Sequence, residues 1–174
     1  MKIIPCTETS LEEAARALLA GGVVVIPTDT VYGLAAHPKF PAAVDRLYTI
    51  KGREAKKPIA LLASDAEVTP VRHPLTSHWP GGLTIVSEGE GYRVPDHEWT
   101  RALLRKCGGL LRVTSANMSG ERPATDAEQA LADVGLSADL VVDDGVSPGG
   151  VASTVVRLSP EGEISILRQG ALRI

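Results

Sequence analysis

The chain has 174 residues, of which 44% are hydrophobic but only 3% aromatic, and its formal net charge is −3. This length suits one compact unit with a substantial core, so we expect a single domain over residues 1–174. So few aromatic rings exclude broad binding of single-stranded nucleic acid by base stacking. The acidic balance argues against a dedicated nucleic-acid binder, although it is compatible with a local basic cleft.

Neither the cysteines nor the histidines have the spacing of a metal site. Cys6 and Cys107 also lack the pattern of a disulfide framework. The N-terminal segment has no basic and apolar regions of a signal peptide, and no apolar run approaches the roughly 18 residues that span a bilayer. We therefore expect a cytoplasmic protein with no metal site of its own and no membrane partner.

The first predicted elements alternate between helix and strand. Residues 10–13, Ser-Leu-Glu-Glu, form a capping box that predicts a helix ending at Gly21-Gly22. The apolar run 23–26 predicts a strand. Apolar spacing over residues 44–50 predicts a second helix, which ends at Lys51-Gly52.

The rest of the chain is predicted to hold short strands around two further helices. One helix covers residues 100–106, and a capping box at residues 125–128 opens the other, which runs to about residue 134. A Pro-Glu-Gly turn at residues 160–162 predicts a terminal hairpin. The expected strands are residues 59–63, 83–86, 92–94, 110–114, 140–142, 153–158 and 163–167. Strands alternating with helices predict a three-layer α/β fold with a mixed sheet.

Two polar triplets follow these predicted elements and point to one phosphate site. Lys51-Gly52-Arg53 ends a helix, and Ser115-Ala116-Asn117 follows a strand. Two cations spaced i, i+2 reach the oxygens of a polyphosphate, while a hydroxyl and a carboxamide fix its orientation. The turn-like segment Pro27–Gly33 directly follows the strand 23–26, where α/β proteins place ligand contacts.

Each of these segments also has an ordinary structural interpretation. Lys51 and Arg53 fit a solvated helix end, where cations meet the helix dipole. If they instead stabilise the transition state, replacing either by Ala should cut turnover by about 10²-fold or more and barely change stability. Ser115 and Asn117 fit a strand-to-loop turn in which Asn adopts a left-handed or Asx conformation. Residues 28–30 fit a turn that satisfies its own hydrogen bonds. Only the combination of segments favours function.

Six motifs in one order resemble the YrdC/TsaC family of L-threonylcarbamoyl-AMP synthases over nearly the whole chain. They are PTDTVYGL at 27–34, KGR at 51–53, WPGGLT at 79–84, SANMSG at 115–120, STVV at 153–156 and ILRQG at 166–170. The resemblance implies a three-layer YrdC-like α/β fold with a twisted mixed β-sheet and an open, positively lined groove. It also implies one domain, without the additional C-terminal domain of longer relatives.

The reaction implied by the resemblance is that of a nucleotidyltransferase. L-threonine, bicarbonate or CO2, and ATP give threonylcarbamoyl-AMP and pyrophosphate, with Mg2+ accompanying the nucleotide. Partner tRNA threonylcarbamoyl transferase proteins then modify adenosine 37 of tRNA, which implies a possible direct contact with tRNA. Charge builds on the phosphoryl oxygens, so positioned cations are the main catalytic requirement.

The resemblance assigns roles to nine residues. The implied catalytic tetrad is Lys51, Arg53, Ser115 and Asn117. The implied ATP-binding residues are Arg53, Lys57, Ser115, Asn117 and Arg168. The implied threonine-binding residues are Thr30, Arg93 and Ser153. Arg93 would grip the threonine carboxylate bidentately. Two alternatives stay open: Arg93 pairs at the surface with Glu88, Glu90 or Asp96, and Arg168 is an exposed charge at a sheet edge.

The sequence also departs from the family pattern. The connector 85–92 is shorter and more acidic than usual, and Gly89 stands where a threonine that contacts ATP often lies. We therefore expect altered ATP affinity or loop order there. Gly82 replaces the last proline of a WPGP motif, and Leu62 matches the aliphatic residue of bacterial relatives.

Three other functions are compatible with the motifs. A YciO-like paralogue shares the fold, and the tetrad does not exclude it. A HypF-like carbamoyl-adenylating domain uses carbamoyl phosphate and ATP, although such domains belong to much larger chains. A tRNA- or double-stranded-RNA-binding module would use the same groove with a salt-sensitive affinity that ATP and threonine do not affect.

Overall fold

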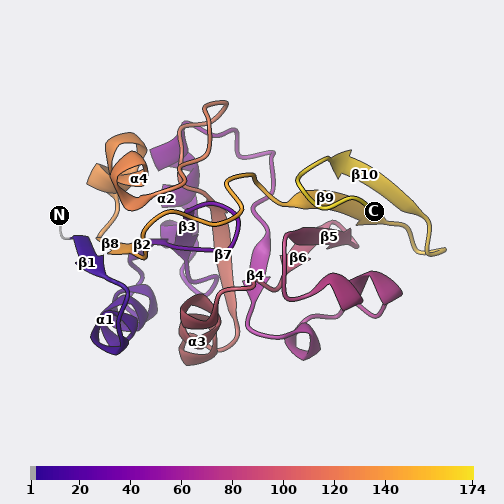
Figure 1. Cartoon of the computed structure of the whole chain (residues 1–174), viewed down its shortest axis with the longest axis horizontal. Coiled ribbons are helices and arrows are strands. Elements are labelled where there is room, and N and C mark those ends of the chain that lie inside the picture. Colours follow the sequence, from indigo (N-terminus) through magenta and orange to yellow (C-terminus); the bar gives the residue numbers. More distant parts are fainter. Residues whose placement is uncertain (1–2) are drawn as a thin grey trace.

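Residues 3–174, which the computed structural model describes, are built around one ten-stranded sheet (Figure 1). Residues 1 and 2 of the expected domain lie outside the described part. The strands are β1 (Ile3–Pro5), β2 (Val23–Ile26), β3 (Gly33–Ala36), β4 (Leu61–Ala63), β5 (Leu83–Ser87), β6 (Glu90–Arg93), β7 (Leu110–Ser115), β8 (Leu140–Asp143), β9 (Thr154–Leu158) and β10 (Ile164–Arg168). The α-helices are α1 (Glu8–Leu19), α2 (Pro41–Lys51), α3 (Glu98–Lys106) and α4 (Ala127–Asp133). Short 3-10 helices are η1 (Ala66–Val68), η2 (Pro74–His78) and η3 (Gly135–Ser137).

The sheet is mixed, as the sequence predicts. Its strand order is β1-β8-β2-β3-β7-β4-β6-β5-β9-β10. The β1–β8, β8–β2, β4–β6 and β5–β9 pairs are parallel, and the other neighbours run antiparallel. In Figure 1 the β9–β10 hairpin, in yellow, forms one end of the sheet.

Helices cover both faces of the sheet and give the predicted three layers. Successive side chains of a strand point to opposite faces. Val24 and Ile26 of β2 accordingly pack with Leu18 of α1 and with α3, while Val23 and Val25 pack with α2 and α4. Figure 1 shows α1 and α3 together on one side and α2 and α4 on the other.

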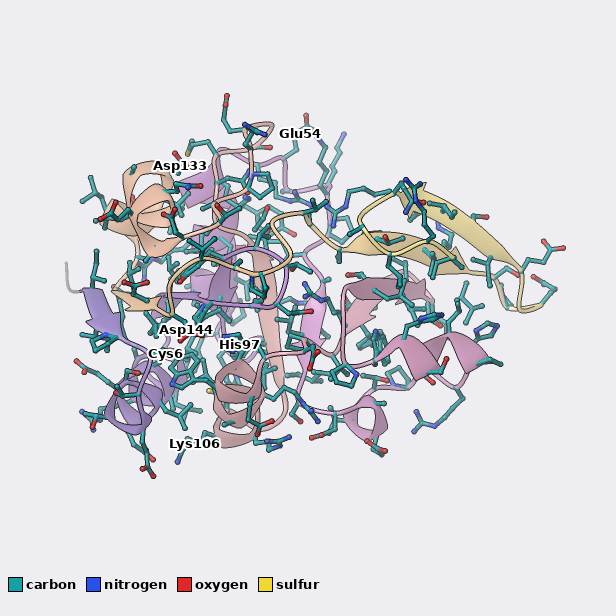
Figure 2. All side chains as sticks on the ribbon, in the orientation of Figure 1. Cys6, Glu54, His97, Lys106, Asp133 and Asp144 are labelled. Atoms are coloured by element: carbon teal, nitrogen blue, oxygen red, sulfur yellow. The ribbon has the colours of Figure 1, made fainter. Side chains whose placement is uncertain are left out.

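Helix starts differ from the predicted ones by one to three residues. Thr7, not Ser10, is the N-cap of α1: its hydroxyl accepts from the Ser10 amide, and Ser10 accepts in turn from the Thr7 amide at 2.8 Å. Asp126 caps α4. His97 caps α3 by accepting from the Thr100 amide through Nδ1, which leaves Nε2 to donate to Asp144 at 2.9 Å (Figure 2).

Two strands were not predicted from the sequence. β3, Gly-Leu-Ala-Ala, contains no β-branched residue, yet it pairs with both β2 and β7 in the middle of the sheet. It is buried on both faces, so it shows no alternation, and its neighbours override its weak propensity. β1 has only three residues. The segment predicted as a turn therefore ends in a strand at Gly33.

The short connector after β5 is an ordered two-residue hairpin turn. Glu88 and Gly89 both have positive φ, at 52° and 82°, which is the pattern of a type I′ turn. Glycine adopts this conformation at no steric cost. The altered connector is thus a tight β5–β6 hairpin. No helix within residues 3–174 is long and apolar enough to cross a bilayer.

Candidate active site

A cavity of about 300 Å3 lies against the sheet, where neighbouring strands and several loops meet. Strands β3, β7, β4, β6, β5, β9 and β10 all contribute to its lining. The β2–β3 loop adds Thr28 and Thr30, and the segment before β9 adds Ala152 and Ser153. This volume lies at the lower end of the range of small-molecule sites.

The cavity brings together six of the nine residues singled out from the sequence. They are Thr30, Arg53, Arg93, Ser115, Ser153 and Arg168. Lys51, Lys57 and Asn117 are not among the described residues that line it. Three of the lining residues are arginines, and none of the described lining residues is a carboxylate. The local charge therefore has the opposite sign to the net charge of the chain.

Lys51 is buried behind the cavity wall. Lys51 is the last residue of α2 and is only 2% exposed. Its ammonium donates to the backbone oxygens of Ser115 and Asn117, both at 2.5 Å. The Ser119 amide donates back to the Lys51 carbonyl at 2.8 Å. The interpretation as a solvated helix end is therefore wrong, because Lys51 clamps α2 to the 115–119 turn.

Burial also changes the acidity of Lys51. Desolvation, and secondarily the positive charge of Arg53, lowers the pKa of its ammonium to about 8. An ordinary lysine is charged throughout the physiological range, whereas this group begins to lose its proton just above neutrality. The charge beside the 115–119 turn is therefore sensitive to moderately alkaline pH.

Asn117 serves the turn in which it lies. Its side-chain amide donates to the backbone oxygens of Met118 at 2.7 Å and Glu121 at 3.0 Å. Among the described residues other than glycine, only Glu88 has positive φ, so Asn117 does not adopt the left-handed conformation considered from the sequence. Ser115 lines the cavity itself. The second triplet thus presents Ser115 to the cavity and uses Asn117 and Lys51 to hold its shape.

Arg53 is hydrogen-bonded to the backbone of the loop that follows α2. Its Nε donates to the Lys57 carbonyl and its Nη2 to the Pro58 carbonyl, both at 3.2 Å. The Lys57 side chain is exposed, and only its backbone takes part in these contacts. The loop after α2 therefore directs one cation, Arg53, to the cavity.

Hydroxyl pairs and Arg168 occupy the other part of the cavity. The Thr28 and Thr30 hydroxyls lie 3.1 Å apart, and the Thr84 and Ser153 hydroxyls lie 2.8 Å apart. Arg168 donates to the Ser153 carbonyl through Nε and Nη2, at 3.0 and 2.8 Å. Burial, and then the charge of Arg53, lowers the pKa of Arg168. Arg168 lies on the edge strand β10 and is exposed, as the alternative interpretation expects, but it also lines the cavity.

Arg93 pairs with Asp29, not with any of the three acidic residues near it in sequence. Its side chain is 7% exposed, its Nη2 donates to Asp29 Oδ1, and its Nε donates to the Gly81 carbonyl at 2.9 Å. Burial lowers the pKa of the guanidinium, the Asp29 carboxylate opposes that change, and Arg168 adds to it. The alternative of a surface ion pair is wrong.

These cations influence one another across the site. The charge of Arg53 disfavours the charged forms of Lys51 and Arg168, and the charge of Arg168 disfavours that of Arg93. Like charges held close together in a partly buried site are stabilised by an incoming anion. The arrangement suits a ligand that carries several negative charges.

The sequence profile of the Sua5/YciO/YrdC family, described as telomere recombination, matches residues 16–170. The chain belongs to the Sua5/YciO/YrdC family. A threonylcarbamoyl-AMP synthase of Idiomarina loihiensis is 32% identical over 173 residues, covering 85% of this chain and 92% of the relative. The motifs quoted from the sequence therefore belong to a family relationship that extends over most of the chain.

Two solved structures are similar to the whole described fold. Sua5 of P. abyssi, complexed with L-threonine, has a TM-score of 0.88 and 29% identity, covering 99% of this chain. This chain spans 58% of that Sua5 chain. YciO of E. coli has a TM-score of 0.85 at 20% identity, covering 98% of this chain and 96% of YciO, which shows the shared fold alone.

Two residues at this site, Thr84 and Asp29, were not predicted from the sequence to be functional. Thr84 ends the WPGGLT motif, but threonine is common in β-strands, so its presence there does not indicate a function. Asp29 reads as a turn residue. Both residues lie inside family motifs, and other members of the Asp29 motif, such as Thr28 and Thr30, line the cavity.

Proposed function

We propose that this chain is an L-threonylcarbamoyl-AMP synthase, which forms threonylcarbamoyl-AMP and pyrophosphate from L-threonine, bicarbonate or CO2, and ATP. The observation that carries the proposal is the cavity itself, in which Arg53, Arg93 and Arg168 meet hydroxyl groups. The two partners of the adenylation step, ATP and the carbamate of threonine, are both anions. The family relationship and the names of the similar proteins support the same activity.

In the proposed mechanism, the residues of the site mainly position the substrates and stabilise charge. The amine of threonine combines with bicarbonate or CO2 to form a carbamate, whose oxygen attacks the α-phosphorus of ATP while pyrophosphate leaves. Negative charge grows on the phosphoryl oxygens and the leaving group, and Arg53 and Arg168 would stabilise it. Ser115 would orient the phosphates from the end of β7, and Lys51 and Asn117 would hold its turn.

The threonine would bind at the part of the cavity that holds Thr30, Arg93 and Ser153. The guanidinium of Arg93 matches a carboxylate, and the hydroxyls offer donors and acceptors to the polar groups of the amino acid. Arg168 donates to the Ser153 carbonyl, so a nucleotide held by Arg168 would lie next to the threonine. This arrangement would place the threonine amine near the α-phosphate.

Mg2+ would enter as the complex of the nucleotide. Residues 3–174 contain no group of three or more His, Cys, Asp or Glu side chains that could hold a metal ion. The ion would therefore be bound chiefly by the phosphates of ATP, and it would neutralise part of their charge. We further propose that the chain acts as one domain in the cytoplasm. It would supply threonylcarbamoyl-AMP to a partner tRNA threonylcarbamoyl transferase, and it would contact tRNA directly only where that transfer requires it.

The direct test is pyrophosphate release from ATP and bicarbonate with L-threonine, L-serine or no amino acid. Threonine-dependent release that is lost in the Arg53→Ala variant is the expected result. Release that does not depend on an amino acid, or no release from a folded sample, would overturn the proposal. In the latter case, YciO-like activity or salt-sensitive RNA binding would be measured on the same sample.

The rate is expected to fall as the pH rises above about 8, because Lys51 then loses its charge. The cysteines and Tyr32 do not titrate there, since burial raises the pKa of Cys6 and Tyr32 to about 12 and of Cys107 to about 11. Deprotonation of free threonine would favour carbamate formation and act in the opposite direction. A pH profile of kcat measures this effect.

The Lys51→Arg variant is the control for that profile. Its guanidinium keeps its proton at every pH used, so the alkaline fall in kcat should disappear even if the overall rate is lower. Because the opposing effect of threonine is common to both proteins, a wild-type profile with the same shape as that of Lys51→Arg, or a fall that persists in Lys51→Arg, would contradict the assignment to Lys51.

A further inference from the structure

Three separate segments meet at the guanidinium of Arg93. Arg93 ends β6, Asp29 lies on the β2–β3 loop, and Gly81 precedes β5. The guanidinium donates to the Asp29 carboxylate through Nη2 and to the Gly81 carbonyl through Nε at 2.9 Å. Two contacts in different directions fix the plane of a guanidinium.

The remaining nitrogen of Arg93, Nη1, has no partner within the described part of the protein. Within the described part of the chain, Nη1 makes no hydrogen bond to protein, and no fully buried side-chain nitrogen or oxygen lacks a partner. Nη1 is therefore accessible, and Arg93 lines the cavity. The protein contacts thus fix Nε and Nη2 of the guanidinium and leave Nη1 to donate to a ligand.

The backbone around Asp29 is hydrogen-bonded to residues 147–149, on the segment before β9. The Gly149 amide donates to the Asp29 carbonyl at 2.9 Å, and the Ser147 hydroxyl donates to the Thr28 carbonyl at 3.1 Å. A Cβ at Gly149 would lie 2.6 Å from the Asp29 oxygen and 3.0 Å from Thr30 Cα. Only glycine permits this close approach, which explains why residue 149 is a glycine.

Asp29 does not reach the cavity directly. Its side chain is 14% exposed, and it is not among the described lining residues, although its neighbours Thr28 and Thr30 are. A carboxylate at the cavity surface would repel an anionic ligand, whereas one behind Arg93 orients the cation. We propose that Asp29 is a positioning residue, which aims the open edge of Arg93 at the carboxylate of the amino-acid substrate. This inference rests on the proposed function.

A positioning role and a purely electrostatic role predict opposite results. If Asp29 acted only through its charge, its removal would strengthen the attraction between Arg93 and a carboxylate, and the KM for threonine would fall. If Asp29 orients Arg93, its removal raises that KM, because a mobile guanidinium must be ordered by the substrate. The sign of the change therefore decides between them.

The experiment measures KM and kcat for threonine-dependent pyrophosphate release in Asp29→Ala and Asp29→Asn. We expect Asp29→Ala to raise the KM for threonine about 10-fold, with the KM for ATP changed by less than about 2-fold. Asp29→Asn keeps an oxygen that can accept from Nη2, so its increase should be smaller. Asp96→Ala removes an exposed carboxylate near Arg93 in sequence and should leave both constants unchanged.

Gly149→Ala tests the same inference from the other side and covers the case in which Asp29→Ala fails to fold. The added methyl group would displace the Asp29 backbone, so the KM for threonine should again rise while thermal unfolding still shows a folded protein. A KM for threonine that is unchanged or lower in Asp29→Asn and Gly149→Ala, or an equal rise for ATP, would overturn the positioning role. A wild type with no threonine-dependent release would instead overturn the proposed function, and this inference with it.

Discussion

Replacing Lys51 by Ala is expected to reduce turnover by about 10²-fold or more and to lower the free energy of unfolding by about 2 kcal/mol. The catalytic loss follows because the ammonium shapes the turn that presents Ser115 and adds positive charge to the site. The loss of stability follows because the carbonyls of Ser115 and Asn117 lose a buried donor. Pyrophosphate release and denaturant unfolding measure the two effects separately.

Arg53→Ala is the matched comparison. It should also reduce turnover by about 10²-fold, since Arg53 lines the cavity, but its unfolding free energy should stay within about 0.5 kcal/mol of the wild type. Arg53 bonds only to carbonyls of its own exposed loop, at Lys57 and Pro58. Lys39→Ala, at an exposed lysine, should change neither quantity. A Lys51→Ala protein as stable as the wild type would contradict the structural role, and one with normal turnover would contradict the catalytic role.

The order of elements could be predicted because it depends on local patterns. The apolar spacing of α2 and its end at Gly52, which adopts a left-handed φ of 59°, are both encoded within a few residues. The apolar run of β2 is equally local. By contrast, β3 is a strand because β2 and β7 lie on either side of it, and its own four residues carry almost no strand signal.

The candidate site could be predicted as a set of residues but not as a set of contacts. The resemblance brought Thr30, Arg93 and Ser153 together, and all three line the cavity. No local pattern shows that Lys51 is buried or that Arg93 pairs with Asp29, because both contacts join residues 64 positions apart. Glu90 appeared to be a possible partner of Arg93, but side chains three apart on a strand point to opposite faces, and Glu90 pairs with Arg112.

Arg93→Ala is expected to raise the KM for threonine by about 10²-fold while changing the KM for ATP much less. The variant loses the guanidinium that would bind the carboxylate, and it leaves the Asp29 carboxylate largely buried without a partner. That carboxylate would then repel the one on threonine. Initial rates with one substrate varied and the other saturating give both constants, and calorimetric titration with L-threonine gives the affinity without turnover.

Combining Arg93→Ala with Asp29→Asn separates the two parts of that loss. Removing the stranded charge should lower the KM for threonine relative to Arg93→Ala alone, although Asp29→Asn raises it when Arg93 is present. If Asp29→Asn raises the KM for threonine when Arg93 is present and lowers it when Arg93 is absent, the two side chains are coupled. Arg93→Lys keeps the charge but cannot bond Gly81, Asp29 and a carboxylate in one plane, so its KM should lie between those of the wild type and Arg93→Ala. Equal increases in the KM for threonine and for ATP would show that Arg93 supports the whole cavity rather than the amino-acid end.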